Sequence, residues 1–182
     1  MFSWLLGRDK QNDVAQRLYR AIVEASRQPE LYQSFGVPDT VDGRFDMIIT
    51  HAIVVFRRLR DDGEMGKEFS QRVFDVMFDD MDAALRELGT GDMTVGKKIR
   101  EMGEAFYGRA QAYEPVLEQG DVKAFAQALF RNLHANEAEN TEVSPEQAGS
   151  AHDLASYFLK IESILETTDS DVFLRGELPE LN

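Results

Sequence analysis

Residues 44–61 read RFDMIITHAIVVFRRLRD, and this stretch decides the fold. Apolar side chains cover more than half of the circumference of a helix drawn over it: Ile48, Ile49, Ala52, Ile53, Val55 and Phe56. A helix that is apolar on so many sides is buried, so the sequence predicts a central core helix here. We expect this helix to end before Gly63.

The segment in front of this helix, residues 35–47 (FGVPDTVDGRFDM), contains two turn dipeptides, Pro38–Asp39 and Asp42–Gly43. Neither dipeptide lies between alternating, strand-like runs, so a hairpin is not expected. The sequence predicts that residues 28–43 form a loop, with a short turn at residues 30–33.

Helical periodicity dominates the rest of the chain, and no strand pattern of length or internal repeat is present. We therefore expect an all-α, single-domain bundle of about six helices over residues 1–182. A short apolar segment (residues 1–10) precedes the bundle and an irregular tail (residues 169–182) follows it. Besides the central helix, the expected helices run from Asn12 or Asp13 to before Pro29, over 66–88, from Asp92 or Thr94 to about 116, from 120–121 to about 134, and over 144–166.

Three glycines, Gly96, Gly103 and Gly108, lie inside the helix that we expect from Asp92 or Thr94. Each costs roughly 1 kcal/mol relative to alanine in an exposed helix. Such costs are easier to explain if a neighbouring helix or a ligand approaches closely at these positions.

Composition and charge exclude several classes of function. The 182-residue chain has a net charge of −13 and no cysteine. A general phosphate-backbone binder is not expected, and thiolate metal sites and cysteine nucleophiles are excluded. Residues 1–60 carry 9 Lys and Arg against 7 Asp and Glu, whereas residues 61–120 carry 7 against 14. The N-terminal third is thus the candidate for contact with an anionic surface.

The first residues are apolar, but no run reaches the roughly 18–20 residues that span a bilayer. This segment is too short for a signal peptide. It either caps the fold or forms a shallow membrane anchor, in which the membrane-contacting side chains would be Phe2, Trp4, Leu5 and Leu6.

Polar side chains offer few catalytic or metal-binding patterns. Asp75, Asp79 and Asp82 share one helix face, but no histidine lies at the spacing of a metal site, so we expect a solvated or ion-paired acidic face and no metal or cofactor. His51 is expected as a core histidine, or alternatively in a polar network with the 39–46 loop.

Aromatic and basic side chains cluster in residues 106–113. Arg109 and Tyr113 can share one helix face, and Tyr107 lies nearby. These residues are either core aromatics beside an ion-paired arginine or one wall of a partner-binding groove.

The order of the segments along the chain resembles the ubiquinol–cytochrome c chaperone family. The resemblance runs over residues 18–133. It is carried by Leu18–Tyr19, Ser26–Arg27, the 36–47 loop with His51, residues 74–82, residues 85–98, residues 102–113, and Arg131–Asn132–Leu133. It implies a non-enzymatic assembly factor that binds newly made cytochrome b or another precursor of ubiquinol–cytochrome c reductase in a helical groove. The resemblance also allows a second small assembly factor as a partner. No direct nucleic-acid partner is implied.

The resemblance also suggests where the protein acts and which residues bind its partner. It indicates a bacterial-type member, cytoplasmic or peripheral to the inner membrane. The matching segments supply the expected partner-binding residues: Asp39, Asp42, Arg44, Phe45, His51, Asp79, Asp82, Lys97, Tyr107, Arg109 and Tyr113. Two alternatives stay open. One is a peripheral membrane adaptor, and the other is a small-ligand binder that uses His51 and the 39–46 loop.

Overall fold

The computed structural model describes residues 3–134 and 144–181, with side chains from residue 11 onward. The described residues form helices and no strands, which confirms the expected all-α class. The helices are α1 (Ser3–Ser26), α2 (Pro29–Gln33), α3 (Val41–Arg60), α4 (Gly63–Glu87), α5 (Asp92–Gln119), α6 (Val122–Leu133), α7 (Pro145–Glu166) and α8 (Ser170–Leu174).

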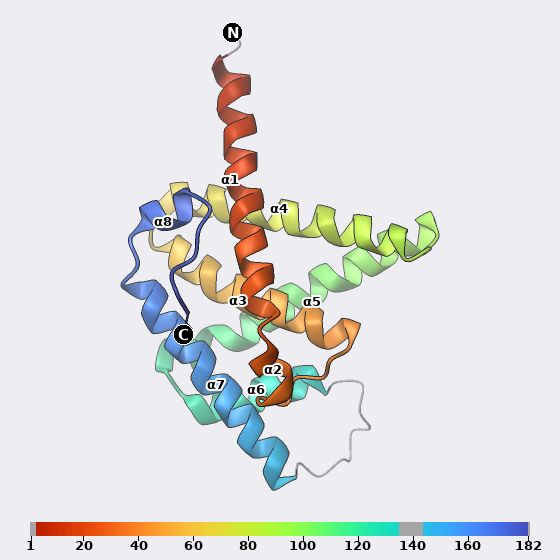
Figure 1. Cartoon of the computed structure of the whole chain (residues 1–182), viewed down its shortest axis with the longest axis vertical. Coiled ribbons are helices and arrows are strands. Elements are labelled where there is room, and N and C mark those ends of the chain that lie inside the picture. The colour runs from red at the N-terminus through yellow and green to blue at the C-terminus, as the bar shows by residue number, and fades with distance from the viewer. Residues whose placement is uncertain (1–2, 135–143, 182) are drawn as a thin grey trace.

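Helix α3 is the centre of the bundle, as its sequence predicts. It packs against α1, α4, α5, α6 and α7 (Figure 1). Its N-terminus is capped by Thr40, whose side chain accepts a hydrogen bond from the Gly43 amide at 3.1 Å. Eleven of its residues are buried, which fixes α3 as the element around which the other helices are arranged.

Helix α4 begins at Gly63, three residues before the predicted start, and crosses α3 closely at Gly66. A Cβ atom at Gly66 would lie 1.7 Å from the carbonyl oxygen of Leu59. Only glycine fits this close approach between the end of α3 and the start of α4. Helices α4 and α5 then extend together from the body of the molecule (Figure 1).

Two terminal predictions differ from the structure. Helix α1 begins at Ser3 rather than at Asn12 or Asp13, because nothing between these positions breaks a helix and continuing the turn satisfies more backbone groups than a new cap would. The expected irregular tail contains α8, which is capped by Asp169 and buries Phe173 completely. A five-residue helix is too short to show a period in the sequence.

Candidate functional site

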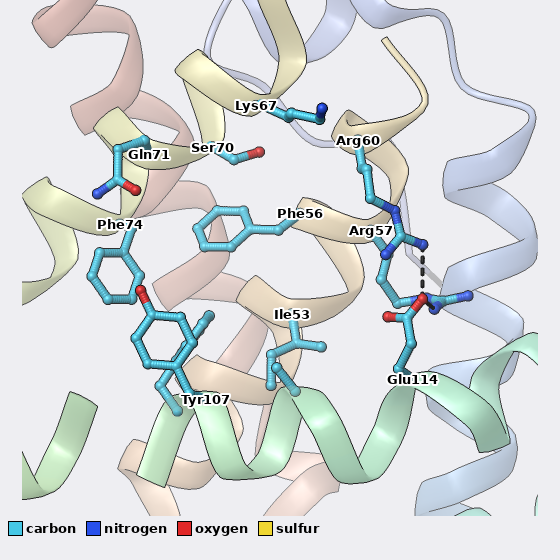
Figure 2. A pocket seen from close by; sticks show the side chains of 12 residues that line it. Ile53, Phe56, Arg57, Arg60, Lys67, Ser70, Gln71, Phe74, Tyr107 and Glu114 are labelled. Atoms are coloured by element: carbon cyan, nitrogen blue, oxygen red, sulfur yellow. Dashed lines mark hydrogen bonds and ion pairs between the residues drawn. The ribbon is translucent and has the colours of Figure 1, made fainter. Parts of the chain in front are cut away.

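A hollow of the surface lies where α3, α4 and α5 meet (Figure 2). A cavity of about 390 Å³ between α3, α4 and α5 adjoins a more open one of about 690 Å³ between α4 and α5. Both are lined by Phe74 and Tyr107, so the two cavities share a wall. We call the pair of cavities the aromatic groove and define it by Phe56, Phe74, Phe78, Phe106 and Tyr107.

The five rings of the aromatic groove contact one another. Phe74 stacks on Phe78 with ring centroids 4.4 Å apart and meets Phe106 edge-on at 5.1 Å. Tyr107 lies 5.8 Å from Phe74, and Phe56 lies 6.1 Å from Phe106. Tyr107 is 61% exposed although it belongs to this cluster. The cluster therefore leaves part of its apolar surface open to solvent.

An ion-pair network borders the end of the groove near α3 (Figure 2). Arg60 pairs with Glu114 at 2.8 Å, and Arg57 bridges Glu114 and Glu162, the latter also at 2.8 Å. Burial alone would raise the pKa of Glu114, but hydrogen bonds from Arg60 and Arg57 bring it below its ordinary value. The network ties α3 to α5 and α7 and keeps the border polar.

One buried polar atom in the wall of the groove lacks a hydrogen-bond partner. The Oγ atom of Ser70, on α4, is buried and has no hydrogen-bond partner within residues 11–134 and 144–181. A buried hydroxyl without a partner costs free energy. Because neighbouring atoms cover this hydroxyl, it does not add a polar contact to the exposed surface of the groove.

The α5 glycines help to keep the groove open. Apart from its chain neighbours and the nearby backbone of its own helix, a Cβ at Gly96 or Gly108 would meet no atom of the described residues within 4 Å, and a Cβ at Gly103 would lie 3.8 Å from Phe78. A neighbouring helix therefore does not approach α5 closely at these glycines, which was one of the two explanations that the sequence allowed. Gly103 and Gly108 instead line the groove, where side chains would narrow it.

His51 lies in the core on the other side of α3. Its Nδ1 lies 2.7 Å from the Met47 carbonyl oxygen and its Nε2 lies 3.1 Å from the Tyr157 hydroxyl. Burial lowers the pKa of His51 to about 4, although the Met47 carbonyl acts in the opposite direction, so the ring is neutral at pH 7. With both nitrogens occupied, His51 is a core histidine rather than part of a network with the 39–46 loop.

Arg109 and Tyr113 also turn inward. Arg109 pairs with the buried Asp46 at 2.7 Å, and the Tyr113 hydroxyl, 1% exposed as a residue, accepts a hydrogen bond from Asn132. Burial raises the pKa of Asp46 to about 6, while Arg109 lowers it. These positions correspond to the core interpretation of the cluster. Only Tyr107 of the three faces the aromatic groove.

The remaining expected partner-binding residues lie apart from the groove. Asp39 and Arg44 form an exposed ion pair at 2.7 Å at the start of α3, where Phe45 is half-buried and Asp42 is exposed. Within the described residues, the hydrogen bonds and ring contacts of the His51 side chain are with Met47, Tyr157 and Phe158 and not with this loop, and the small-ligand alternative stays a prediction.

The acidic face of α4 is solvated, as expected. Asp79 is exposed, and Asp82 pairs with Arg86 at 2.5 Å. Arg86 also binds Asp92 and so bridges the α4–α5 turn. On α5, Lys97 pairs with Glu101 at 3.5 Å. Among the described residues no cluster of three or more His, Asp or Glu could hold a metal ion.

The N-terminal membrane hypothesis falls largely outside the described part. Phe2 is not described, and neither are the side chains of Trp4, Leu5 and Leu6. In Figure 1 the first turns of α1 project beyond the other helices. No helix within the described ranges is both long enough and apolar enough to cross a bilayer.

Sequence reasoning missed most of the groove. Phe74 was in a matching segment but was not assigned to a surface, and Phe78, Ile99 and Ser70 were not considered as lining residues. Aromatic side chains at helical spacing indicate a core, and nothing in the pattern distinguishes a groove from it. The α5 glycines were the available signal.

Comparisons with known proteins identify the family. A family model described as ubiquinol-cytochrome C chaperone matches residues 33–180. Ubiquinol-cytochrome-c reductase complex assembly factor 1 of Xenopus laevis is 26% identical over 165 residues, which span 90% of this chain and 78% of that protein. The human protein of that name is 24% identical over 126 residues, and the match spans 69% of this chain but only 42% of the human protein.

A solved structure is similar over the whole chain. The crystal structure of the Cbp3 homolog from Brucella abortus superposes with a TM-score of 0.80 at 32% identity, covering 100% of this chain and 98% of that one. The family match extends through α7 and α8, beyond the 18–133 range of the resemblance. This chain therefore belongs to the ubiquinol–cytochrome c chaperone family, whose members assist assembly of ubiquinol–cytochrome c reductase.

Proposed function

We propose that the protein is an assembly chaperone that holds an apolar segment of a newly made reductase subunit, with cytochrome b as the first candidate, in the aromatic groove. The observation that carries this proposal is a set of five contacting aromatic rings in an open groove. Membership of a reductase-assembly family supports the choice of client.

The groove suits an apolar helix. Such a helix buries its surface in a groove of helices and is held by a few large side chains. Phe74 and Tyr107 lie at the junction of the two cavities, where they contact a guest in either half. Gly103 lets the guest approach the α5 backbone.

The polar border explains how such a guest could be released. The Arg60–Glu114 pair is partly exposed, so it stays hydrated and does not seal the groove. A guest held by apolar contact alone can pass to another hydrophobic surface, such as the other subunits of the complex. A second small assembly factor would then bind elsewhere on the chaperone.

Site-specific photo-crosslinking in the native host tests the client and its place together. A photoreactive residue is placed at Tyr107, with Ser163 on the exposed side of α7 as the control position, and crosslinked membrane proteins are identified by mass spectrometry. We expect cytochrome b or another reductase subunit from position 107 and not from 163. Equal recovery from both positions, or no respiratory subunit from either, contradicts the proposal.

A groove-filling variant provides a second test. Gly103→Leu inserts a side chain into the groove, and Gly149→Leu makes the same change in α7, where a Cβ has open space. We expect Gly103→Leu to reduce crosslinking to the subunit and the amount of assembled reductase, while Gly149→Leu leaves both unchanged. Normal assembly with Gly103→Leu would exclude the groove as the binding site.

The projecting N-terminus of α1 favours one additional role, as a peripheral membrane adaptor at the inner membrane. Deletion of residues 1–8 tests it in a liposome flotation assay with anionic vesicles. Loss of flotation supports a membrane anchor, and unchanged flotation excludes this segment as the membrane contact.

A further inference from the structure

A second cleft lies between α6 and α7, on a different part of the molecule from the aromatic groove. It has a volume of about 450 Å³, within the range of sites that hold small molecules. Its apolar lining consists of Phe130 with three alanines, Ala126, Ala148 and Ala151. Because alanines are short, the two packed helices leave a trough between them.

The polar residues that line this cleft are basic or neutral. Lys123, Gln127 and Arg131 lie at four-residue intervals and so follow one face of α6, and His152 lies on α7. Of the described residues that line the cleft, none is acidic, although the chain has 33 acidic and 20 basic residues. Within the described ranges neither Lys123 nor Arg131 pairs with a carboxylate, unlike the arginines that border the aromatic groove.

From this geometry we propose that the α6–α7 cleft binds an anionic amphiphile, a carboxylate or phosphate carried on a single alkyl chain. Phe130 and the alanines accept the chain. Lys123 and Arg131 stand eight residues apart, about 12 Å along the helix, so a head group at either end of the trough meets a cation. Arg131 can bind such a group through two parallel hydrogen bonds, and Gln127 can donate one more.

The probe for this site is dodecyl phosphate, titrated below its micelle concentration and followed by calorimetry. We expect one molecule to bind per chain, and dodecanol to bind at least about tenfold more weakly because it lacks the charge. No binding of dodecyl phosphate, or equal binding of dodecanol, overturns the proposal.

Matched variants locate the site. Arg131→Glu should weaken binding about tenfold or more, and Lys160→Glu, the same charge change on an exposed α7 residue outside the cleft, should leave it unchanged. Ala148→Phe fills the mouth of the trough from an exposed position and should abolish binding even if Arg131→Glu does not fold. Equal affinities in all folded variants contradict the assignment.

Vesicle binding distinguishes the two possible sources of the ligand, a membrane lipid and a free amphiphile. Binding to phosphatidylcholine vesicles that contain phosphatidylglycerol, lost in Arg131→Glu but not in Lys160→Glu, assigns the ligand to a membrane lipid. Binding of monomeric dodecyl phosphate without such vesicle binding assigns it to a free amphiphile. Vesicle binding that is equal in both variants excludes the cleft as a lipid site.

Discussion

The two sides of α3 differ in how completely they are covered. Toward α7, His51 is 2% exposed and contacts Tyr157 and Phe158, and Phe158 has no exposed surface. Toward the aromatic groove, Phe56 is only half-buried and its neighbour Tyr107 is 61% exposed. One apolar helix thus has a closed side and an open side. We infer that its α7 side stabilises the fold and its groove side is left for a partner.

The largest difference should appear when an aromatic ring is removed from each side. Phe158→Ala leaves a cavity in a closed core and should lower the free energy of unfolding by about 3–5 kcal/mol. Phe74→Ala removes a ring that already borders an open groove. The decrease in the free energy of unfolding should therefore be well below that range. Urea denaturation of both variants measures the difference. Equal losses would mean that the groove side is as important for stability as the core side.

The buried histidine makes the closed side sensitive to acid. His51 titrates near 6.5 when unfolded and at about 4 when folded, so the unfolded state takes up the proton first. Stability is therefore complete above pH 6.5 and falls as the pH drops toward 4, by at most about 3 kcal/mol.

Unfolding of the wild type and of His51→Leu, measured from pH 7 to 4.5, isolates this contribution. The variant loses a constant amount of stability at every pH because Tyr157 loses its partner. Its stability relative to wild type should nevertheless rise toward low pH, because only the wild type has a histidine to protonate at this position. Parallel pH profiles for the two proteins would show that His51 does not titrate in this range.

The Asp46–Arg109 pair near the junction of α3 and α5 should act in the opposite direction. The folded-state pKa of Asp46 is about 6, above its usual value, so the folded state binds the proton first. This carboxylate destabilises the fold above pH 6, and the protein regains about 2 kcal/mol as the pH falls from 6 toward 4. Wild type should therefore gain stability relative to Asp46→Asn on acidification. A relative loss would mean that Arg109 dominates over burial.

The sequence predicts the closed side better than the open side. The apolar circumference of residues 44–61 was sufficient to place α3 in the core and to favour a core position for His51 over the polar network. Periodicity cannot show how α4 is placed against α3, because this depends on the close approach at Gly66, where a Cβ atom would lie 1.7 Å from the carbonyl oxygen of Leu59. Phe74 and Phe158 are therefore indistinguishable in the sequence, although one borders the groove and the other is fully buried.

Charged residues show the same limit. Arg109 was grouped with Tyr107 because the two are close in the chain, but the partner of Arg109 is Asp46, which lies 63 positions earlier on α3. Pairing over such a distance is fixed by packing and not by local pattern. The expected partner-binding residues on the α3 N-terminus and on α4 remain predictions.

The smallest effect on stability should have the sharpest consequence for function. Gly103→Ala should raise the free energy of unfolding by up to about 1 kcal/mol, because alanine favours the helix and its Cβ meets Phe78 only at a normal contact distance of 3.8 Å. Gly149→Ala in α7 should gain a similar amount, since it too has open space. Thermal unfolding measures both gains, and crosslinking from position 107 measures client capture. If Gly103 is glycine in order to admit a guest, only Gly103→Ala will combine higher stability with weaker capture. Undiminished capture in this variant would mean that the guest does not reach the α5 backbone and rests on the aromatic rings alone.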